Sequence, residues 1–131
     1  MSTDEITLTL PADRDYYRVA HLVLGGLAVR LNLTFEHLED LQLALDGVLD
    51  RHQPDAEVTV RVNVQGSVIE TQVGPFPGDG FSRELEREDA EPVGLRRVLA
   101  TVVDGVRLDE RAGAEWVTLT KRVGTPPEAE G

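Results

Sequence analysis

The sequence contains no cysteine, and this absence excludes disulfide bonds, thiol nucleophiles and thiolate metal ligands. Its three histidines, His21, His37 and His52, lie too far apart in sequence for any pair to share a helix face as zinc ligands. No apolar run approaches the roughly 18 residues of a membrane-spanning helix, and the N-terminal stretch MSTDEITLTL lacks the basic region of a signal peptide. We therefore expect no membrane association, no metal site and a cytoplasmic location.

Positive charge is also scarce. Lys and Arg number 13 against 24 Asp and Glu, which gives a formal net charge of −11. Nucleic-acid phosphates and anionic membranes repel such a surface, so no direct nucleic-acid binding is expected, whereas a basic protein partner is compatible with it. At 131 residues the chain is long enough for one domain with its own core, expected over 1–124. The stretch 125–131, TPPEAEG, is Pro-rich and acidic and is expected to be disordered.

Periodic apolar residues predict the elements of the fold. Helical spacing predicts three helices, over about 17–31, 35–51 and 95–102, and Thr34 can cap the second. Alternating apolar residues predict strands at about 6–10, 57–64, 68–73, 106–108 and 115–123. The segment 74–92 combines Gly, Pro and charge without a sustained period, and it is expected to be a long loop.

Strands paired in hairpins, with helices gathered between them, indicate a two-layer α/β sandwich. We expect a mixed, mostly antiparallel sheet with helices on one face. The second helix contains one unusual residue, Gly47, which costs about 0.5–1 kcal/mol relative to alanine. Either a neighbouring segment packs closely there, or the position has lost a side chain that had a chemical role.

Three stretches, ITLTLPAD, LEDLQLALDGVLD and VGLRRVLATVVDGVRL, carry a family resemblance that extends from about Ile6 to Val123. They resemble the RsbW-type anti-sigma factors, which belong to the GHKL group of ATPases with histidine kinases and gyrase. The resemblance implies the GHKL, or histidine-kinase-like, ATPase fold and a homodimer. It also implies two kinds of protein partner, a sigma factor and a STAS-domain anti-anti-sigma protein. Many members phosphorylate the latter on serine or threonine with Mg-ATP.

The catalytic helix of the family is changed in this sequence. Its motif carries a Glu that helps to activate the attacking hydroxyl and an Asn that holds Mg²⁺. Alignment of LALDGVLDRH places Gly47 at the Glu position and Arg51 at the Asn position. Asp46 projects about 100° away around the helix, so it does not simply replace the Glu. Arg51 cannot coordinate a metal, although a guanidinium can bind phosphate. The resemblance therefore implies no catalytic residue and no metal ligand at these positions.

Two nucleotide-binding loops are altered as well. The family's DxGxG loop supplies an Asp for adenine, but here Pro75 stands near that position and Asp79-Gly80 comes later. The family's GxGL turn, which binds phosphates through backbone N–H groups, is retained only as Gly94-Leu95. The resemblance thus implies a degenerate nucleotide pocket made of Asp46, Asp50, Arg51, Asp79, Gly80, Gly94 and Leu95. We expect no cofactor, with Mg-ATP as the ligand if the pocket still functions.

Partner binding is expected on the first helix, where family members use exposed basic side chains. Arg14, Arg18 and His21 have the spacing of one helix face, and an ordinary solvated face is the alternative interpretation. The charged run Arg83–Asp89 stands where the family carries its ATP lid. It is interpreted as a solvated loop or a short surface helix.

The preferred hypothesis is an anti-sigma-like protein that binds a sigma factor or a STAS-domain protein and has no kinase activity. The alternative is an ATP-dependent serine/threonine protein kinase that phosphorylates an anti-anti-sigma factor, with Asp46 or Asp50 as base. A third hypothesis is a regulatory ATP-binding module without transfer activity. The side chain that faces the pocket distinguishes the first two hypotheses. Arg51 there counts against a kinase, whereas Asp50 there would retain an acidic Mg²⁺ ligand.

Overall fold

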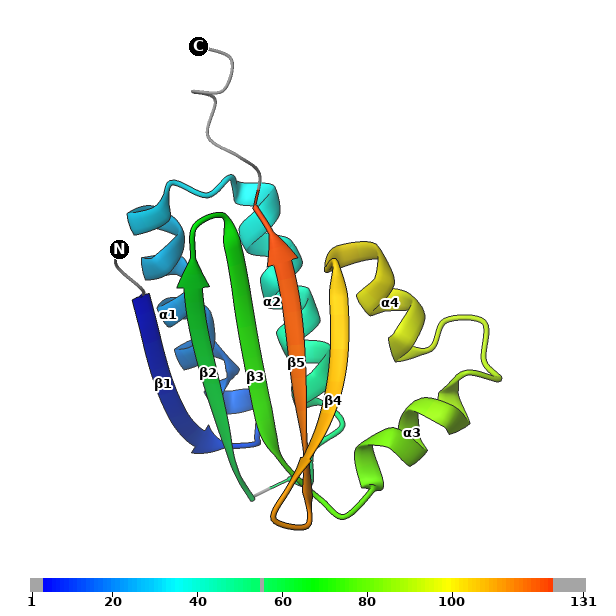
Figure 1. The fold of residues 1–131 in the computed structure, drawn as a ribbon. Coiled ribbons are helices and arrows are strands. Elements are labelled where there is room, and N and C mark those ends of the chain that lie inside the picture. Colours follow the sequence, from blue (N-terminus) through cyan, green and yellow to red (C-terminus); the bar gives the residue numbers. More distant parts are fainter. Residues whose placement is uncertain (1–3, 55, 124–131) are drawn as a thin grey trace.

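The computed structural model describes residues 4–54 and 56–123 of the chain. The tail expected to be disordered, 125–131, lies outside the described residues. Within the described part, no helix is both long enough and apolar enough to cross a membrane. Figure 1 shows the elements, which in chain order are β1 (Asp4–Pro11), the 3-10 turn η1 (Arg14–Tyr16), α1 (Tyr17–Leu31), α2 (Phe35–Leu49), β2 (Glu57–Gln65), β3 (Val68–Pro77), α3 (Gly80–Glu88), α4 (Leu95–Val102), β4 (Gly105–Arg111) and β5 (Ala114–Arg122).

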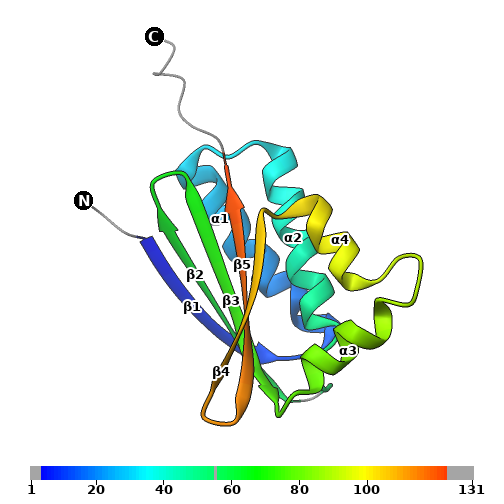
Figure 2. The same cartoon turned by 45° about the vertical axis from the view of Figure 1, so that its right-hand side comes forward.

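The strands form one sheet in the order β1-β2-β3-β5-β4, and each neighbouring pair is antiparallel. The helices lie to one side of this sheet, with α4 beside α2 (Figure 2). The expected two-layer α/β sandwich is therefore confirmed, but the sheet is antiparallel rather than mixed. The reason is the helical hairpin α1–α2, which returns the chain to the end of the sheet that it left after β1. The next strand, β2, must then run antiparallel beside β1.

Local sequence explains where several elements begin and end. The Thr34 side chain accepts the backbone N–H of His37 over 3.0 Å and so caps the start of α2. Asn32 adopts the left-handed conformation, with φ 59°, and ends α1. In the β4–β5 turn φ is positive at both Ala112 and Gly113, as a two-residue type I′ hairpin turn requires.

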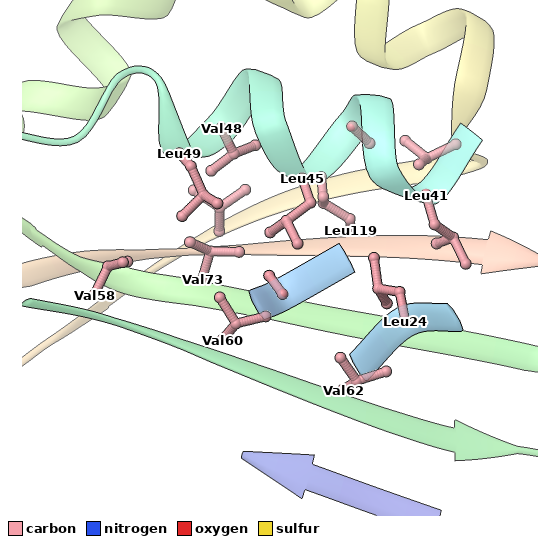
Figure 3. Packing of buried hydrophobic residues seen from close by; sticks show 14 of the residues in the cluster. Leu24, Leu41, Leu45, Val48, Leu49, Val58, Val60, Val62, Val73 and Leu119 are labelled. Atoms are coloured by element: carbon pink, nitrogen blue, oxygen red, sulfur yellow. The ribbon is translucent and has the colours of Figure 1, made fainter. Parts of the chain in front are cut away.

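The hydrophobic core lies between the sheet and the first two helices. Every second residue of β2 is buried, beginning with Val58, while the residues between them are exposed or half-buried. Figure 3 shows Leu45 and Val48 of α2 pointing toward Val73 and Leu119 of the sheet. Complete burial of one such side chain contributes about 1.5–3 kcal/mol. This face therefore holds α2, and the candidate residues at its C-terminal end, firmly against the sheet.

The segment expected to be a long loop, 74–92, contains more structure than predicted. Strand β3 continues to Pro77, and a helix, α3, follows at Gly80–Glu88. Of the two interpretations of the charged run, the short helix is the one observed. Its buried residues are Phe81, Leu85 and Glu88, which have helical spacing. Because one of these three is charged, the apolar periodicity that identifies a helix is incomplete.

Candidate functional site

Four candidate residues lie at the C-terminal end of α2: Asp46, Gly47, Asp50 and Arg51. Successive residues of a helix project about 100° apart, so these positions face different neighbours. Asp46 and Asp50 contact side chains of the α1 region, whereas Gly47 and Arg51 face α4 and α3. The expected pocket is thus divided between two faces of one helix.

Arg51 forms a bidentate ion pair with Glu88, the last residue of α3. Its Nε donates to Oε2 of Glu88 over 2.9 Å, and one terminal nitrogen donates to Oε1 over 2.6 Å. The other terminal nitrogen donates to the carbonyl oxygen of Gly47 over 3.1 Å. Oε1 of Glu88 also accepts the backbone N–H of Leu95, the first residue of α4, over 3.1 Å. One carboxylate therefore links α2, α3 and α4.

The surroundings of Glu88 keep its carboxylate ionised. Hydrogen bonds from Arg51 are the main cause that lowers the pKa of Glu88 from 4.5 to about 2, and the Leu95 N–H acts in the same direction. Burial opposes this shift, because Glu88 is only 4% exposed and a buried carboxyl group favours its neutral form. The same hydrogen bonds raise the pKa of Arg51. The pair therefore stays charged at neutral pH.

Two glycines, Gly47 and Gly94, allow α2, α3 and α4 to approach one another closely. A Cβ atom at Gly47 would lie 2.8 Å from Cδ1 of Leu95, so an α4 side chain occupies the space beside Gly47. A Cβ atom at Gly94 would lie 2.5 Å from the carbonyl oxygen of Glu88. Gly94 has an ordinary φ of −87°, so space rather than backbone conformation requires glycine there. Close packing, one of the two explanations for Gly47, is thus present in the structure, and it involves the end of a side chain rather than backbone.

The acidic residues of α2 are paired with the α1 region. Asp50 accepts hydrogen bonds from Arg14 and from the hydroxyl of Tyr17, each over 2.8 Å. Asp46 lies 2.8 Å and 3.0 Å, through its two oxygens, from Nε2 of His21. Burial, aided by the hydrogen bond to Asp50, raises the pKa of Tyr17. Burial also raises the pKa of Asp46, against the opposing effect of His21. Both carboxylates therefore have partners in η1 or α1.

The three residues expected to bind a partner are placed differently from one another. Arg14 lies in η1 rather than in the first helix, and both Arg14 and His21 are occupied with the carboxylates of α2. Arg18 is exposed, and within residues 4–54 and 56–123 its side chain has no hydrogen bond or ion pair. Arg18 is thus the member of the three that is available to another molecule.

Asp79 and Gly80 lie at the start of α3, at the opposite end from its ion pair with α2. The structure therefore does not bring these two candidates to the other pocket residues. Asp79 forms an exposed ion pair with Arg83, one turn later, at 3.2 Å. This is the arrangement of an ordinary helix start, in which an acidic group near the N-terminus is favourable.

Aromatic side chains fill the space between β3 and α3. Phe76 of β3 packs against Phe81 of α3 with ring centroids 4.7 Å apart, and against His52 with centroids 4.9 Å apart. Nε2 of His52 lies 2.7 Å from the carbonyl oxygen of Pro75. All three rings are buried, and such packing holds α3 against the sheet. The residue at the expected adenine position, Pro75, therefore adjoins a closely packed cluster.

A polar groove of about 480 Å³ opens beside the ion pair between α2 and α3. Its two arginines are both paired, Arg51 with Glu88 and Arg87 with Glu84 and, at 3.7 Å, with Glu91. Acidic groups outnumber basic ones along the groove, and an approaching anion is therefore repelled. The lining residues are Asp50, Arg51, Glu84, Arg87, Glu88, Glu91 and Val93.

Known proteins resemble this chain in sequence. No protein-family model matches it. The protein named serine-protein kinase RsbW from Listeria innocua is 29% identical over 96 residues, which cover 68% of this chain and 60% of that protein. The protein of the same name from Listeria monocytogenes is 29% identical over 140 residues, covering 92% of this chain and 88% of the other. Its counterpart in Bacillus subtilis is 27% identical over 141 residues, with coverages of 92% and 86%.

A solved structure has the same fold. The crystal structure of the RsbU and RsbW domains of Rv1364c from Mycobacterium tuberculosis matches 94% of this chain with a TM-score of 0.68 and 18% sequence identity, and the chain spans 33% of that longer one. The chain is thus similar to proteins named RsbW over nearly its whole length, which confirms the resemblance expected from its sequence. Its sheet and helices have the fold of that solved chain, in agreement with the fold that the sequence resemblance implied.

In this chain, sequence reasoning found the residues at the end of α2 and the start of α4, but it missed Glu88 and His52. The spacing of Phe81, Leu85 and Glu88 was a usable signal, because it places the glutamate on the buried face of a helix. No comparable signal existed for His52. Its contacts depend on β3, which lies elsewhere in the sequence.

Proposed function

We propose that this RsbW-type chain is an anti-sigma-like regulator that binds a sigma factor or a STAS-domain anti-anti-sigma protein and transfers no phosphate. One observation carries the proposal: each charged side chain at the end of α2 already has a partner within the protein. Asp46 contacts His21, Asp50 contacts Arg14 and Tyr17, and Arg51 contacts Glu88. The sequence likeness to proteins named RsbW supports the assignment to a regulatory family.

The side chains at this site do not fit Mg-ATP. Magnesium prefers oxygen ligands, but Arg51 brings a cation to the position aligned with the metal ligand. A general base must lie within hydrogen-bond reach of the hydroxyl that it activates; Gly47 has no side chain, and Asp46 is held by His21. The start of α4, where backbone N–H groups would bind phosphate, faces the carboxylate of Glu88.

The outer face of α1 supports binding to another protein. Leu22 and Val29 are 71% and 84% exposed, and Arg18 lies one turn before Leu22 on the same face. Exposed apolar side chains gathered beside a basic group are typical of protein-binding surfaces. The net charge of −11 would in addition attract a basic partner at long range, and salt would weaken that attraction.

Introduction of a glutamate on α1 tests this binding face. Arg18→Glu and Leu22→Glu are each expected to weaken binding of the partner roughly tenfold or more, which corresponds to about 1.4 kcal/mol. Titration calorimetry with sigma factors and STAS-domain proteins from the same genome would measure the affinity. Arg107→Glu on the edge strand β4 is the matched control and should bind as the wild type does. Wild-type affinity in both α1 variants would contradict the assignment.

Thermal unfolding tests whether the chain takes nucleotide. We expect the Tm to be unchanged by ATP or ADP, with or without Mg²⁺, because Glu88 hydrogen-bonds to the start of α4 and Arg51 stands at the position aligned with the metal ligand. A ligand at 100 times its Kd would stabilise the fold by about 2.7 kcal/mol, which is readily detected in a chain of this size. A Mg²⁺-dependent increase in Tm with ATP would contradict this part of the proposal.

Serine/threonine protein kinase activity is the second candidate function. The names of the relatives favour it, as does the position of Asp50 in the groove beside Arg51. Asp50 would become available as an acidic group if Arg14 and Tyr17 released it. Labelled ATP incubated with the chain and a STAS-domain partner distinguishes the two functions. Phosphate on a serine or threonine of the partner would replace the first proposal with the second.

A further inference from the structure

Where α3 meets the start of α4, the carboxylate of Glu88 lies against the guanidinium of Arg51 and the first backbone N–H of α4. Arg51 directs two N–H groups at the two carboxylate oxygens of Glu88, and the N–H of Leu95 completes the set. A planar guanidinium and a helix N-terminus are both groups that bind phosphate or carboxylate. In this chain both are engaged by one glutamate that is 4% exposed.

The same glutamate is placed there by the packing of α3. Phe81 and Leu85 lie on the buried face of that helix, one and two turns before Glu88. Gly94 leaves room for the carbonyl oxygen of Glu88, where a Cβ atom would come within 2.5 Å. The carboxylate can therefore reach Arg51 only when α3 is closed against the rest of the protein.

The other charged groups around the groove form their hydrogen bonds and close ion pairs with partners other than Arg51. Arg87 pairs with Glu84 and Glu91 on its own side of the groove. Asp50 is held by Arg14 and Tyr17. Glu88 is thus the acidic group that neutralises Arg51, and the remaining acidic groups oppose the entry of an external anion.

We propose that Glu88 is an autoinhibitory group, which competes as an internal anion with external phosphate for Arg51 and the start of α4. Closure of α3 and binding of an external anion then exclude each other. The internal carboxylate has the advantage of a high effective concentration, because it is tethered to its site. External phosphate consequently cannot displace it, and α3 stays closed until a change elsewhere removes Glu88 from Arg51.

Replacement of Glu88 by alanine in the full chain tests this competition with inorganic phosphate as the probe. At pH 7 and constant ionic strength, phosphate should raise the Tm of Glu88→Ala by several degrees in a saturable manner, because the vacated position can take one anion. The wild type should show no saturable increase. Glu86→Ala, which removes the same charge from an exposed position of α3, should respond as the wild type does.

The double variant Arg51→Ala/Glu88→Ala identifies the residue that binds the anion. It should lose the phosphate response of Glu88→Ala. Equal responses of the wild type and Glu88→Ala, no response in either, or a response that persists in the double variant would each overturn the proposal.

A second variant covers the case in which Glu88→Ala does not fold. Glu88→Gln keeps the size of the side chain but removes its charge, so the amides of α3 should exchange with solvent at least tenfold faster than in the wild type while those of α2 are unchanged. Wild-type exchange rates in α3 would overturn the proposal. None of these measurements needs a protein partner, so failure to find a sigma factor or STAS-domain protein that binds would leave their outcome unaffected.

Discussion

Replacement of Arg51 by alanine is expected to lower the free energy of unfolding by about 3 kcal/mol at pH 7, at the lower end of the range for breaking a buried ion pair. The variant leaves the carboxylate of Glu88 buried with the Leu95 N–H as its remaining donor. The effect stays near the lower end because the Arg51 side chain is 25% exposed, whereas that of Glu88 is 6% exposed. Urea denaturation of both proteins at pH 7 measures the difference.

The same variant should change how stability depends on pH. The pKa of Glu88 is lowered in the folded protein from 4.5 to about 2, so the native state favours the ionised carboxylate. The resulting stabilisation is fully present above about pH 4.5 and is lost as the pH falls toward about 2. Without Arg51, burial favours protonation of Glu88. The stability difference between wild type and variant should therefore be largest at neutral pH and decrease below pH 4.5.

Arg96 provides the matched control for this substitution. It also pairs with an aspartate near the end of α3, Asp89 at 3.2 Å, but both side chains are about half exposed. An exposed pair contributes at most about 1 kcal/mol, so the free energy of unfolding of Arg96→Ala should lie within about 1 kcal/mol of the wild-type value. If Arg51→Ala were no more destabilising than Arg96→Ala, the ion pair with Glu88 would have no structural role.

Replacement of Gly94 by alanine is expected to destabilise the fold by about 1–3 kcal/mol, the usual cost of overpacking. The added Cβ would meet the carbonyl oxygen of Glu88 at 2.5 Å and its carbon at 3.0 Å. These are backbone atoms, so the contact can be relieved only by moving the end of α3 away from α4. Thermal unfolding would report the loss of stability, and hydrogen exchange would locate it in α3.

Gly26, in the middle of α1, is the control for this substitution. A Cβ atom there would meet nothing within 4 Å. Alanine should then stabilise the helix by about 0.5–1 kcal/mol, because glycine loses more conformational freedom in a helix. If Gly94→Ala lowers the free energy of unfolding while Gly26→Ala raises it, the close approach of α3, rather than helix propensity, requires glycine at position 94. A neutral or stabilising Gly94→Ala would contradict the closed arrangement of α3 and α4.

Most of the fold could be predicted because it rests on local periodicity. The alternating residues of β2 and the apolar spacing of α2 relate neighbours in sequence, and a strand or a helix repeats over only a few positions. The same spacing placed Gly47 and Arg51 one turn apart on one face of α2. The sequence by itself therefore determined the two-layer class, the RsbW-type resemblance and the identity of the residues at the end of α2.

Only the tertiary structure decided which partner each charged group has. Arg51 and Glu88 are 37 positions apart, and Arg14 and Asp50 are 36 apart, so no local pattern relates them. Asp46 and Asp50 face α1 because the two helices pack as a hairpin. Glu88 reaches Arg51 because Phe81 seats α3 against the sheet. Such contacts depend on where distant segments pack. The sequence therefore identified Arg51 as the cation at the end of α2, whereas only the fold determined that Glu88 neutralises it.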